Sequence, residues 1–280
     1  MYRSKPIGVF DSGIGGLTVF RALREALPQE DFIYLGDMAR LPYGNKSQET
    51  VESYALQIAS HFRKVGIKLL IVACNTASAQ ALSVLKARYP DLPVLGVVQP
   101  GARAAVEASA NGRIVVLATE GTVRSGAYQR EILSLRPDAQ VEAHACNLFV
   151  ALAEEGWGDA PEALPIVRRY LAQIKLADYD TVVLGCTHFP LLVPALRQLL
   201  PSSVKLVDSA ESMATVVKAY LAENELAAFS IRDSIPDSLR VENRQGHESF
   251  WVTDTPERFR LMATRFLNRE VGDKVELIAL

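Results

Sequence analysis

Five apolar residues, Leu69-Leu70-Ile71-Val72-Ala73, run directly into Cys74-Asn75-Thr76, and a helix-like stretch follows. An apolar run of this length between polar residues is typical of a strand buried in a parallel sheet. The same pattern recurs where Val182-Val183-Leu184-Gly185 precedes Cys186-Thr187-His188. Open α/β sheets bind ligands at the carboxyl ends of their strands. Both thiols are therefore predicted to face a binding crevice.

The repeated unit belongs to a chain in which apolar strands alternate with helical patterns. Strands are expected at 7–10, 32–35, 68–73, 94–98, 114–118, 141–146, 181–184, 204–207, 250–253 and 275–279. Helices are expected at 18–26, 48–65, 76–88, 148–155, 162–175, 190–200 and 256–267, with another from about 126. Alternation of this kind favours an α/β fold with two similar domains, each a mostly parallel sheet flanked by helices. The active site is then expected in the cleft between them.

Two turns are predicted to carry the chain between the domains, and 280 residues suffice for two cores. Gln99-Pro100-Gly101 is the expected crossing into the second domain, and Asp208-Ser209-Ala210 is the expected return. The first domain would comprise 1–97 plus 208–280, and the second 98–207. Residues 119–125 are read as a polar turn, and 230–249 as an irregular polar connection.

Composition limits the class of partner. The chain is 49% hydrophobic and 22% charged, with a net charge of −2 and a pI near 6.1. This balance gives no electrostatic footprint for nucleic acid or a membrane surface. No run approaches the roughly 18 apolar residues of a membrane helix, and the first residues lack a secretory apolar core. Three cysteines without a CxxC pair favour a reduced, cytoplasmic protein.

A thiol at a strand end that opens a helix lies in the positive field of the helix N-terminus, which favours the thiolate. An ordinary thiol has a pKa of about 8.5, so a modest downward shift would make it a usable base. Burial for packing is the usual explanation of a single such cysteine. The matched settings of Cys74 and Cys186 favour function for the pair. Cys146 lacks this setting and is read as packing.

Two further side chains are candidates for the same crevice. Asp11 ends the first strand, and His188 lies two residues beyond Cys186, where it could tune or shuttle a proton. The structural alternatives are a helix cap for Asp11 and an exposed imidazole for His188. His61 and His247 have no such context and are expected at the surface.

A glycine-rich segment, Gly13-Ile14-Gly15-Gly16, follows the first strand. Its backbone N–H groups could cradle a carboxylate or phosphate at a helix start. The segment is not the dinucleotide fingerprint, because the third glycine is missing at the required spacing. Alternatively, it only shapes a tight connection. The sequence has no P-loop and no HExxH motif, and its Cys/His spacing does not suggest a metal site.

Six segments in a fixed order identify a family. They are Gly8-Val9-Phe10-Asp11-Ser12-Gly13-Ile14-Gly15-Gly16, Gly36-Asp37-Met38-Ala39-Arg40-Leu41-Pro42-Tyr43-Gly44, Ala73-Cys74-Asn75-Thr76-Ala77, Ala118-Thr119 with Gly121-Thr122-Val123, residues 149–156, and Gly185-Cys186-Thr187-His188-Phe189-Pro190. Over residues 7–226 the chain resembles the glutamate racemases of the cofactor-independent aspartate/glutamate racemase superfamily. Residues 254–267 are also similar to the ending of some members.

This resemblance implies roles for individual residues. Cys74 and Cys186 would be the two proton donor/acceptors on opposite faces of the substrate, with Asp11 assisting Cys74 and with Glu154 and His188 assisting Cys186. The implied substrate contacts are Asp11, Ser12, Tyr43, Gly44, Asn75, Thr76, Thr187 and His188. Asn147 departs from the proline that many members have after the cysteine, and Glu155 is the alternative to Glu154.

The implied activity is interconversion of L- and D-glutamate without a cofactor or a metal, supplying D-glutamate for peptidoglycan. Racemisation removes a proton from one face of Cα and delivers one to the other, so two groups are required, one ionised and one protonated. The loop with Tyr43 and Gly44 is expected to close over the substrate. The expected partner is glutamate alone. Assembly as a homodimer is left open, because the sequence does not show the oligomeric state.

Three other functions remain open at this point. A racemase of the same superfamily could act on aspartate or a hydantoin, although Cys-Thr-His favours glutamate because aspartate-type members usually carry an acidic residue at the position of His188. A two-lobed binding protein for small anions would use the cysteines only structurally. A redox sensor would join Cys74 and Cys186 in a reversible disulfide.

Overall fold

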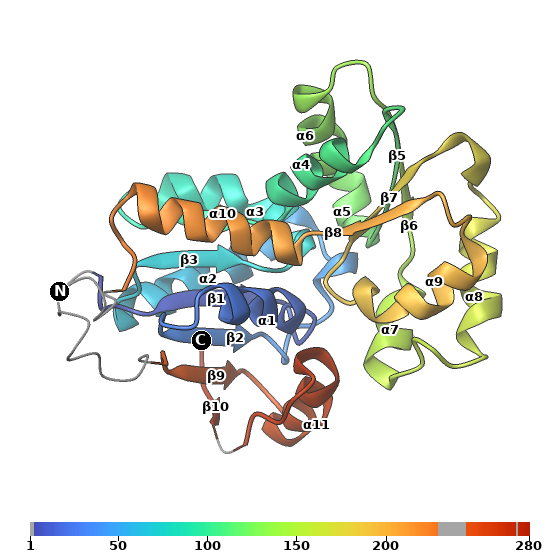
Figure 1. Ribbon diagram of the computed structural model, residues 1–280. Coiled ribbons are helices and arrows are strands. Elements are labelled where there is room, and N and C mark those ends of the chain that lie inside the picture. The colour runs from blue at the N-terminus through green and yellow to red at the C-terminus, as the bar shows by residue number, and fades with distance from the viewer. Residues whose placement is uncertain (1–2, 229–244, 273) are drawn as a thin grey trace, which may run out of the picture.

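The structure is a computed structural model that describes residues 3–228, 245–272 and 274–280. Two separate parallel sheets, each flanked by helices, lie side by side (Figure 1). The first has the order β10-β9-β2-β1-β3-β4, and the second β6-β5-β7-β8. Every paired strand is parallel. The predicted α/β class with two similar halves is therefore confirmed.

The strands of the first sheet come from both ends of the described chain. They are β1 (Ile7–Asp11), β2 (Phe32–Gly36), β3 (Leu69–Val72), β4 (Val94–Gly96), β9 (Glu248–Val252) and β10 (Val275–Leu277). The second sheet is continuous in sequence. It contains β5 (Arg113–Ala118), β6 (Gln140–Ala145), β7 (Thr181–Gly185) and β8 (Lys205–Asp208).

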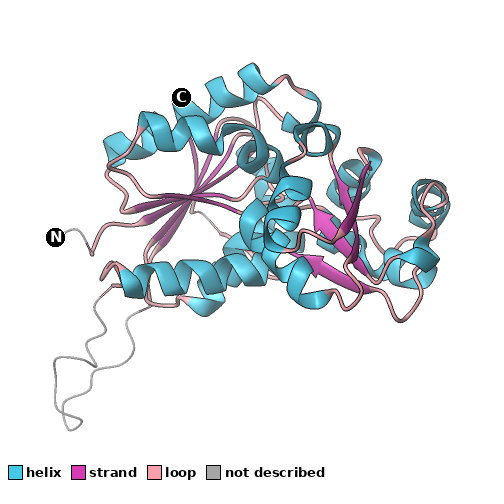
Figure 2. Cartoon of the chain, turned by 90° about the horizontal axis from the view of Figure 1, so that it is seen from above, coloured by secondary structure: helices cyan, strands magenta, loops and turns pink. Residues whose placement is uncertain are grey.

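Alternate residues of the first sheet point to opposite faces, and each face has its own helices. Val9, Tyr34 and Ile71 pack against α1 (Leu17–Ala26), α10 (Ala210–Glu223) and α11 (Pro256–Leu267). The other face, with Phe10 and Val72, packs against α2 (Gln48–Val65) and α3 (Asn75–Arg88). Figure 2 shows the strands between these two helix layers.

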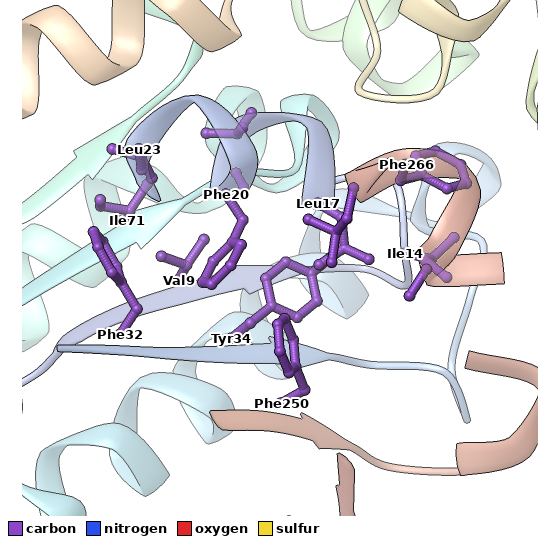
Figure 3. Close-up of a cluster of buried hydrophobic side chains, with 14 of the residues drawn as sticks. Val9, Ile14, Leu17, Phe20, Leu23, Phe32, Tyr34, Ile71, Phe250 and Phe266 are labelled. Atoms are coloured by element: carbon purple, nitrogen blue, oxygen red, sulfur yellow. The ribbon is translucent and has the colours of Figure 1, made fainter. Parts of the chain in front are cut away.

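Aromatic side chains fill the first of these faces (Figure 3). Phe20 meets Phe32 and Tyr34 edge-on, with ring centroids 5.6 and 5.8 Å apart, and Phe250 of β9 lies 5.2 Å from Phe20. All four rings are buried. Because such a ring leaves a large cavity when truncated, Phe20→Ala should cost roughly 3–5 kcal/mol of stability.

The second sheet repeats this arrangement. One face packs against α4 (Val98–Ala108) and α6 (Ala127–Leu135), and the other against α7 (Leu148–Glu155), α8 (Ala163–Leu171) and α9 (Val193–Leu199). The remaining helices of the described residues are short. They are α5 (Glu120–Ser125) and three 3₁₀ turns, at Tyr43–Asn45, Leu176–Asp178 and Phe189–Leu192.

Local sequence signals explain the bounds of α2, which match the prediction. Ser47 caps the helix, since its side chain accepts a hydrogen bond from the Thr50 amide. Gly66 ends the helix with φ of 89°, a left-handed conformation that glycine adopts without steric cost. The predicted apolar face from Val51 to Phe62 is buried.

Several sequence predictions are wrong. Gln99, Pro100 and Gly101 do not form a turn but lie in α4, where Pro100 is tolerated because first-turn N–H groups have no intrahelical partner. Residues 120–125 form α5 rather than a turn, with Thr119 as its N-cap. Helix α10 was not predicted. The expected helix at 190–200 is split between a 3₁₀ turn and α9, and the one at 162–175 ends at Leu171.

The predicted domain boundaries stay a prediction. The strands divide between the sheets as expected, although α4 contacts α10 as well as β7 and β8. Of the predicted irregular connection at 230–249, residues 230–244 lie outside the described residues, and Glu248 and Ser249 belong to β9. Among the described helices, none is both long and apolar enough to cross a membrane.

Candidate active site

The carboxyl ends of the two sheets share one pocket. Cys74, directly after β3 and Ala73, and Cys186, directly after β7, both line it, and their exposed fractions are 5% and 6%. Most of the predicted substrate contacts line it too. The full lining is Ser12, Gly13, Leu41, Pro42, Tyr43, Gly44, Cys74, Asn75, Thr76, Thr119, Val150, Glu154, Cys186, Thr187 and His188.

Cys74 is the N-cap of α3. Its Sγ accepts from the Ala77 amide at 3.5 Å, and its thiol donates to Ser12 Oγ at 3.4 Å. Burial, and then the charge of Asp11, nevertheless raise the pKa of Cys74 to about 12. The predicted downward shift is therefore wrong for this thiol. The field at the start of the helix is present, but loss of water around the sulfur outweighs it.

Asp11 is fully buried beside Cys74. Its Oδ2 accepts from the Gly13 amide at 2.9 Å, whereas Oδ1 has no hydrogen-bond partner. Burial raises the pKa of Asp11, and the nearby His188 acts in the opposite direction. A buried carboxylate oxygen without a partner is costly in a resting protein and is typical of functional sites.

Cys186 lies at the start of a line of side chains. Its Sγ is 3.8 Å from His188 Nδ1, and His188 Nε2 is 3.2 Å from Glu154 Oε1. Burial acts to lower the pKa of His188, but its hydrogen bonds with Cys186 and Glu154 outweigh burial and raise it to about 10. The imidazole is therefore a buried cation at neutral pH. The alternative of an exposed imidazole is excluded, because His188 is 6% exposed.

Glu154 takes the opposite charge. Partial burial acts to raise its pKa, but the hydrogen bond from His188 and the charge of Arg258 lower it. Arg258 Nη2 lies 3.7 Å from Glu154 Oε2. The neighbouring Glu155 is exposed and does not line the pocket.

The glycine-rich segment brings the two halves of the pocket together. A Cβ atom on Gly15 would collide with His188 Nδ1 and Thr187 Oγ1. Thr18, the second residue of helix α1, donates to the backbone carbonyl of Thr187 at 3.2 Å. This close approach requires glycine, whatever the segment contributes to ligand binding.

The loop between β2 and α2, which lines part of the pocket, is anchored by Asp37. This buried carboxylate accepts from the Tyr43 hydroxyl, from Arg40 Nε at 2.7 Å and from Thr253 Oγ1 at 2.8 Å. Burial and Asp37 raise the pKa of Tyr43 well above its ordinary value, so the hydroxyl stays protonated. Gly44 packs closely against Thr119, since a Cβ atom added to Gly44 would lie 2.7 Å from the Cβ atom of Thr119. The loop therefore contacts the second half.

Asn75 and Thr76 are held by residues of the second half. Tyr128 donates its hydroxyl proton to Asn75 Oδ1 at 2.8 Å, which leaves Asn75 Nδ2 as a buried donor without a partner. Thr76 Oγ1 is 2.8 Å from Thr119 Oγ1. The pocket therefore contains an oriented amide N–H₂ group that no protein group satisfies.

Other candidates do not reach the pocket. Cys146 is buried in the core of the second half and does not line it, in agreement with the packing interpretation. All three cysteines are free. His247 is exposed as predicted, whereas His61 is half-buried with its ring against Trp251.

Sequence reasoning missed Tyr128, Val150 and Arg258. Tyr128 lies in no recognised segment, whereas Val150 and Arg258 lie in segments 149–156 and 254–267, where nothing in the sequence singled them out. Within the described ranges, no group of three or more His, Cys, Asp or Glu side chains is placed to hold a metal ion.

This fold and site define an enzyme with two α/β lobes and a thiol from each lobe in a shared pocket. Residues 7–217 match the model of the Asp/Glu/Hydantoin racemase family. The chain belongs to this family, and it is therefore an isomerase of the racemase class.

Individual relatives agree over nearly the whole length. The glutamate racemase of Geobacter metallireducens is 48% identical over 269 residues, which are 96% of this chain and 95% of the relative. The glutamate racemase of Francisella tularensis in complex with D-glutamate has a TM-score of 0.88 and 33% identity, covering 99% of this chain and 98% of that one. The Thermus thermophilus glutamate racemase in complex with beta-chloro-D-alanine has a TM-score of 0.81 and 41% identity, covering 100% and 97%.

Proposed function

We propose that this protein is a glutamate racemase that interconverts L- and D-glutamate with Cys74 and Cys186 as its two proton donor/acceptors. The observation that carries the proposal is that both sulfur atoms line one pocket but come from different sheets. A single base cannot serve both faces of Cα, whereas two groups on opposite walls can. Relatives named glutamate racemase across nearly the full length support the choice of substrate.

The proposed reaction is a proton relay across Cα. The thiolate on one side takes the Cα proton, and the electron pair of the broken C–H bond moves into the α-carboxylate. The thiol on the other side then delivers its proton to the opposite face, which leaves a thiolate there. The reverse reaction starts from that state, so one site serves both enantiomers. General acid–base catalysis of this kind is worth roughly 10²–10⁴-fold.

Stabilising the carbanion is the harder task. Charge grows on the α-carboxylate, and preorganised donors are the most effective means of stabilising it. The unpartnered amide of Asn75 is such a donor, since Tyr128 already fixes its oxygen. We assign Ser12, Thr76 and Thr187 to the same function because their hydroxyl-bearing side chains line the pocket.

Asp11 is assigned to the Cys74 side. Two buried acids next to each other resist ionisation together, and Asp11 accordingly raises the pKa of Cys74. A substrate with an α-ammonium group would bring a positive charge to this pair and thereby favour the Cys74 thiolate. Ionisation of Cys74 is then coupled to substrate binding.

His188 and Glu154 are assigned to the Cys186 side. The imidazolium of His188 can stabilise a negative charge that develops on Cys186 Sγ, 3.8 Å away. Glu154 holds the imidazole by its other nitrogen, which keeps Nδ1 directed at the sulfur. This side therefore needs no charge from the substrate.

The test is a chiral assay with purified protein in heavy water and no added cofactor. Either enantiomer of glutamate should yield the other, with deuterium at Cα of the product. Aspartate and a hydantoin serve as comparison substrates. Turnover of aspartate in preference to glutamate would reassign the substrate, and absence of Cα exchange with all three would reject the proposal.

The cellular role follows from the activity. We propose that the D-glutamate enters peptidoglycan and that the enzyme works in the cytoplasm, where its three free cysteines stay reduced. Assembly as a homodimer is a separate proposal, which sedimentation of the purified protein would test.

A further inference from the structure

Helix α11 carries a long-range contact that the proposed chemistry does not use. The helix packs on the first sheet through Phe259, Met262, Ala263 and Phe266, which belong to the core around α1. One edge of this buried face reaches α7, the helix of the second half that carries Glu154. Segments more than a hundred residues apart therefore meet at the carboxylate beside His188.

Two arginines make this contact, and they lie seven residues apart, so that they share one face of α11. Arg258 Nη2 is 3.7 Å from Glu154 Oε2. Arg265 Nη1 donates to the backbone carbonyl of Glu154 at 2.7 Å. The same guanidinium lies over Gly156, which ends α7 with φ of 76°. One arginine thus holds the side chain of Glu154, and the other holds its backbone.

The third contact is with the imidazole itself. The ring of Phe266 lies edge-on to His188, with centroids 5.5 Å apart and an interplanar angle of 84°. On its remaining sides His188 faces Cys186, Glu154 and, electrostatically, Asp11. Helix α11 therefore borders both members of the Glu154–His188 pair.

Resting on the proposed function, we propose that Arg258 and Arg265 are positioning residues that hold Glu154 against His188 from the opposite lobe. The charges along this line alternate, from the guanidinium through the carboxylate to the imidazolium. Besides His188 and Arg258, the charged groups of the described residues near Glu154 are Arg265, on its backbone carbonyl, and Asp11, which acts through space. Removal of the guanidinium should therefore make Glu154 easier to protonate, and protonated Glu154 no longer holds an imidazolium.

The first measurement does not depend on turnover. The chain has four histidines, so the ring signals of His188 can be assigned in an NMR titration by comparison with a His188→Asn variant. Protonation of Glu154 in the acid range should appear as an inflection in the His188 shifts. In Arg258→Gln this inflection should move up by about 0.5 pH unit, as expected for a half-exposed ion pair.

The second measurement is the pH profile of kcat/KM with glutamate. The apparent pKa of its acid limb should rise by the same interval in Arg258→Gln. Arg265→Gln should lose about tenfold in kcat, and Arg265→Lys should restore most of that loss, because a lysine ammonium can still donate to the carbonyl. Arg63→Gln is the matched control. Arg63 lies on α2, away from the pocket, and makes an exposed ion pair with Asp91.

The outcomes separate the two proposals. If glutamate is not racemised by the unmodified protein, the proposed function fails, while the NMR inflection still tests the role of Arg258. If the inflection and the acid limb of Arg258→Gln coincide with those of Arg63→Gln, and Arg265→Lys is as impaired as Arg265→Gln, the positioning role is overturned.

Discussion

The two walls of the pocket hold the same functional group in opposite electrostatic settings. Cys74 sits beside a buried carboxylate and has a raised pKa, whereas Cys186 sits beside a buried imidazolium. On the Cys74 wall, the charged neighbour Asp11 is fully buried. The Cys186 wall continues through His188 and Glu154 to Arg258, which is half exposed.

This difference shows that similar local sequence does not produce similar electrostatic surroundings. Both cysteines follow a buried strand, yet their neighbours come from different parts of the chain and carry opposite charge. In the proposed mechanism the unequal walls are useful, since each turnover needs one ionised and one protonated thiol. The following experiments would sharpen or break the comparison.

The largest effect is expected from removing either sulfur. Cys74→Ser and Cys186→Ser should each lower racemisation by about 10³-fold or more, because an alcohol is a far weaker acid and groups that act as a unit fail together. Chiral chromatography measures the rate, and circular dichroism checks the fold. Near-normal turnover in either variant would contradict the two-thiol assignment.

The next largest effect is expected from two substitutions, one on each wall, that replace a charged side chain with a neutral one. Asp11→Asn and His188→Asn should each lower kcat by roughly 10²-fold. Only Asp11→Asn should also speed alkylation of Cys74 by iodoacetamide below pH 12, because Asp11 raises the pKa of this thiol. Peptide mapping resolves the three cysteines, and Cys146 serves as the internal reference. Unchanged alkylation of Cys74 would contradict the electrostatic role of Asp11.

The stability of the protein should depend on pH through His188. Its pKa rises from an ordinary 6.5 to about 10 on folding. The charged imidazole therefore stabilises the fold fully below about pH 6.5, and this contribution is lost as pH rises towards 10. The difference in Tm between the unmodified protein and His188→Asn should shrink over this window. A difference that stays constant from pH 6 to pH 10 would mean that the imidazole is neutral when buried.

A smaller effect is expected from the donor that orients Asn75. Tyr128→Phe removes the hydrogen bond to Asn75 Oδ1 and frees the amide to rotate. We expect about a tenfold loss in kcat/KM, with the titration of His188 unchanged. If activity is retained, the orientation of Asn75 does not depend on Tyr128.

The smallest effect is expected from the hydrogen bonds that anchor the loop between β2 and α2 at Asp37, because they lie outside the immediate surroundings of either thiol. Thr253→Val removes a donor to Asp37 and an acceptor for the Ala39 amide. A rise of about threefold in KM, with kcat little changed, would indicate a loop that binds substrate less well. Thr215→Val is the control, since its hydroxyl only donates to a carbonyl on its own helix. Equal kinetics in the two variants would show that Thr253 does not help to hold the loop at the pocket.

Much of the fold could be predicted because hydrophobic periodicity and caps are local signals. The bounds of α2 and α11 and the positions of all ten strands agree with the structure to within a few residues. Errors arose where a local signal was overridden. Pro100 and Gly101 indicated a turn but lie in the first turns of α4, whose face with Ala102 and Ala105 is buried against the second sheet.

Most of the residues that line the pocket could be named from the sequence, but their catalytic roles stay a prediction and their energetics could not be foreseen. Cys74, Cys186 and Asp11 were found from strand ends, and Glu154 came from the family resemblance. The raised pKa of Cys74 could not be foreseen, because burial is a property of the folded pocket. Tyr128 and Arg258 were missed because their contacts with Asn75 and Glu154 link segments distant in sequence.

The order of the strands also bears on when activity can appear during synthesis. Strand β9 lies beside β2, and the segment after it supplies Thr253, Arg258 and Arg265. Both cysteines are therefore synthesised well before the residues that contact the loop and Glu154. The nascent chain would carry both cysteines without a finished pocket until the segment after β9 has folded against β2 and Glu154.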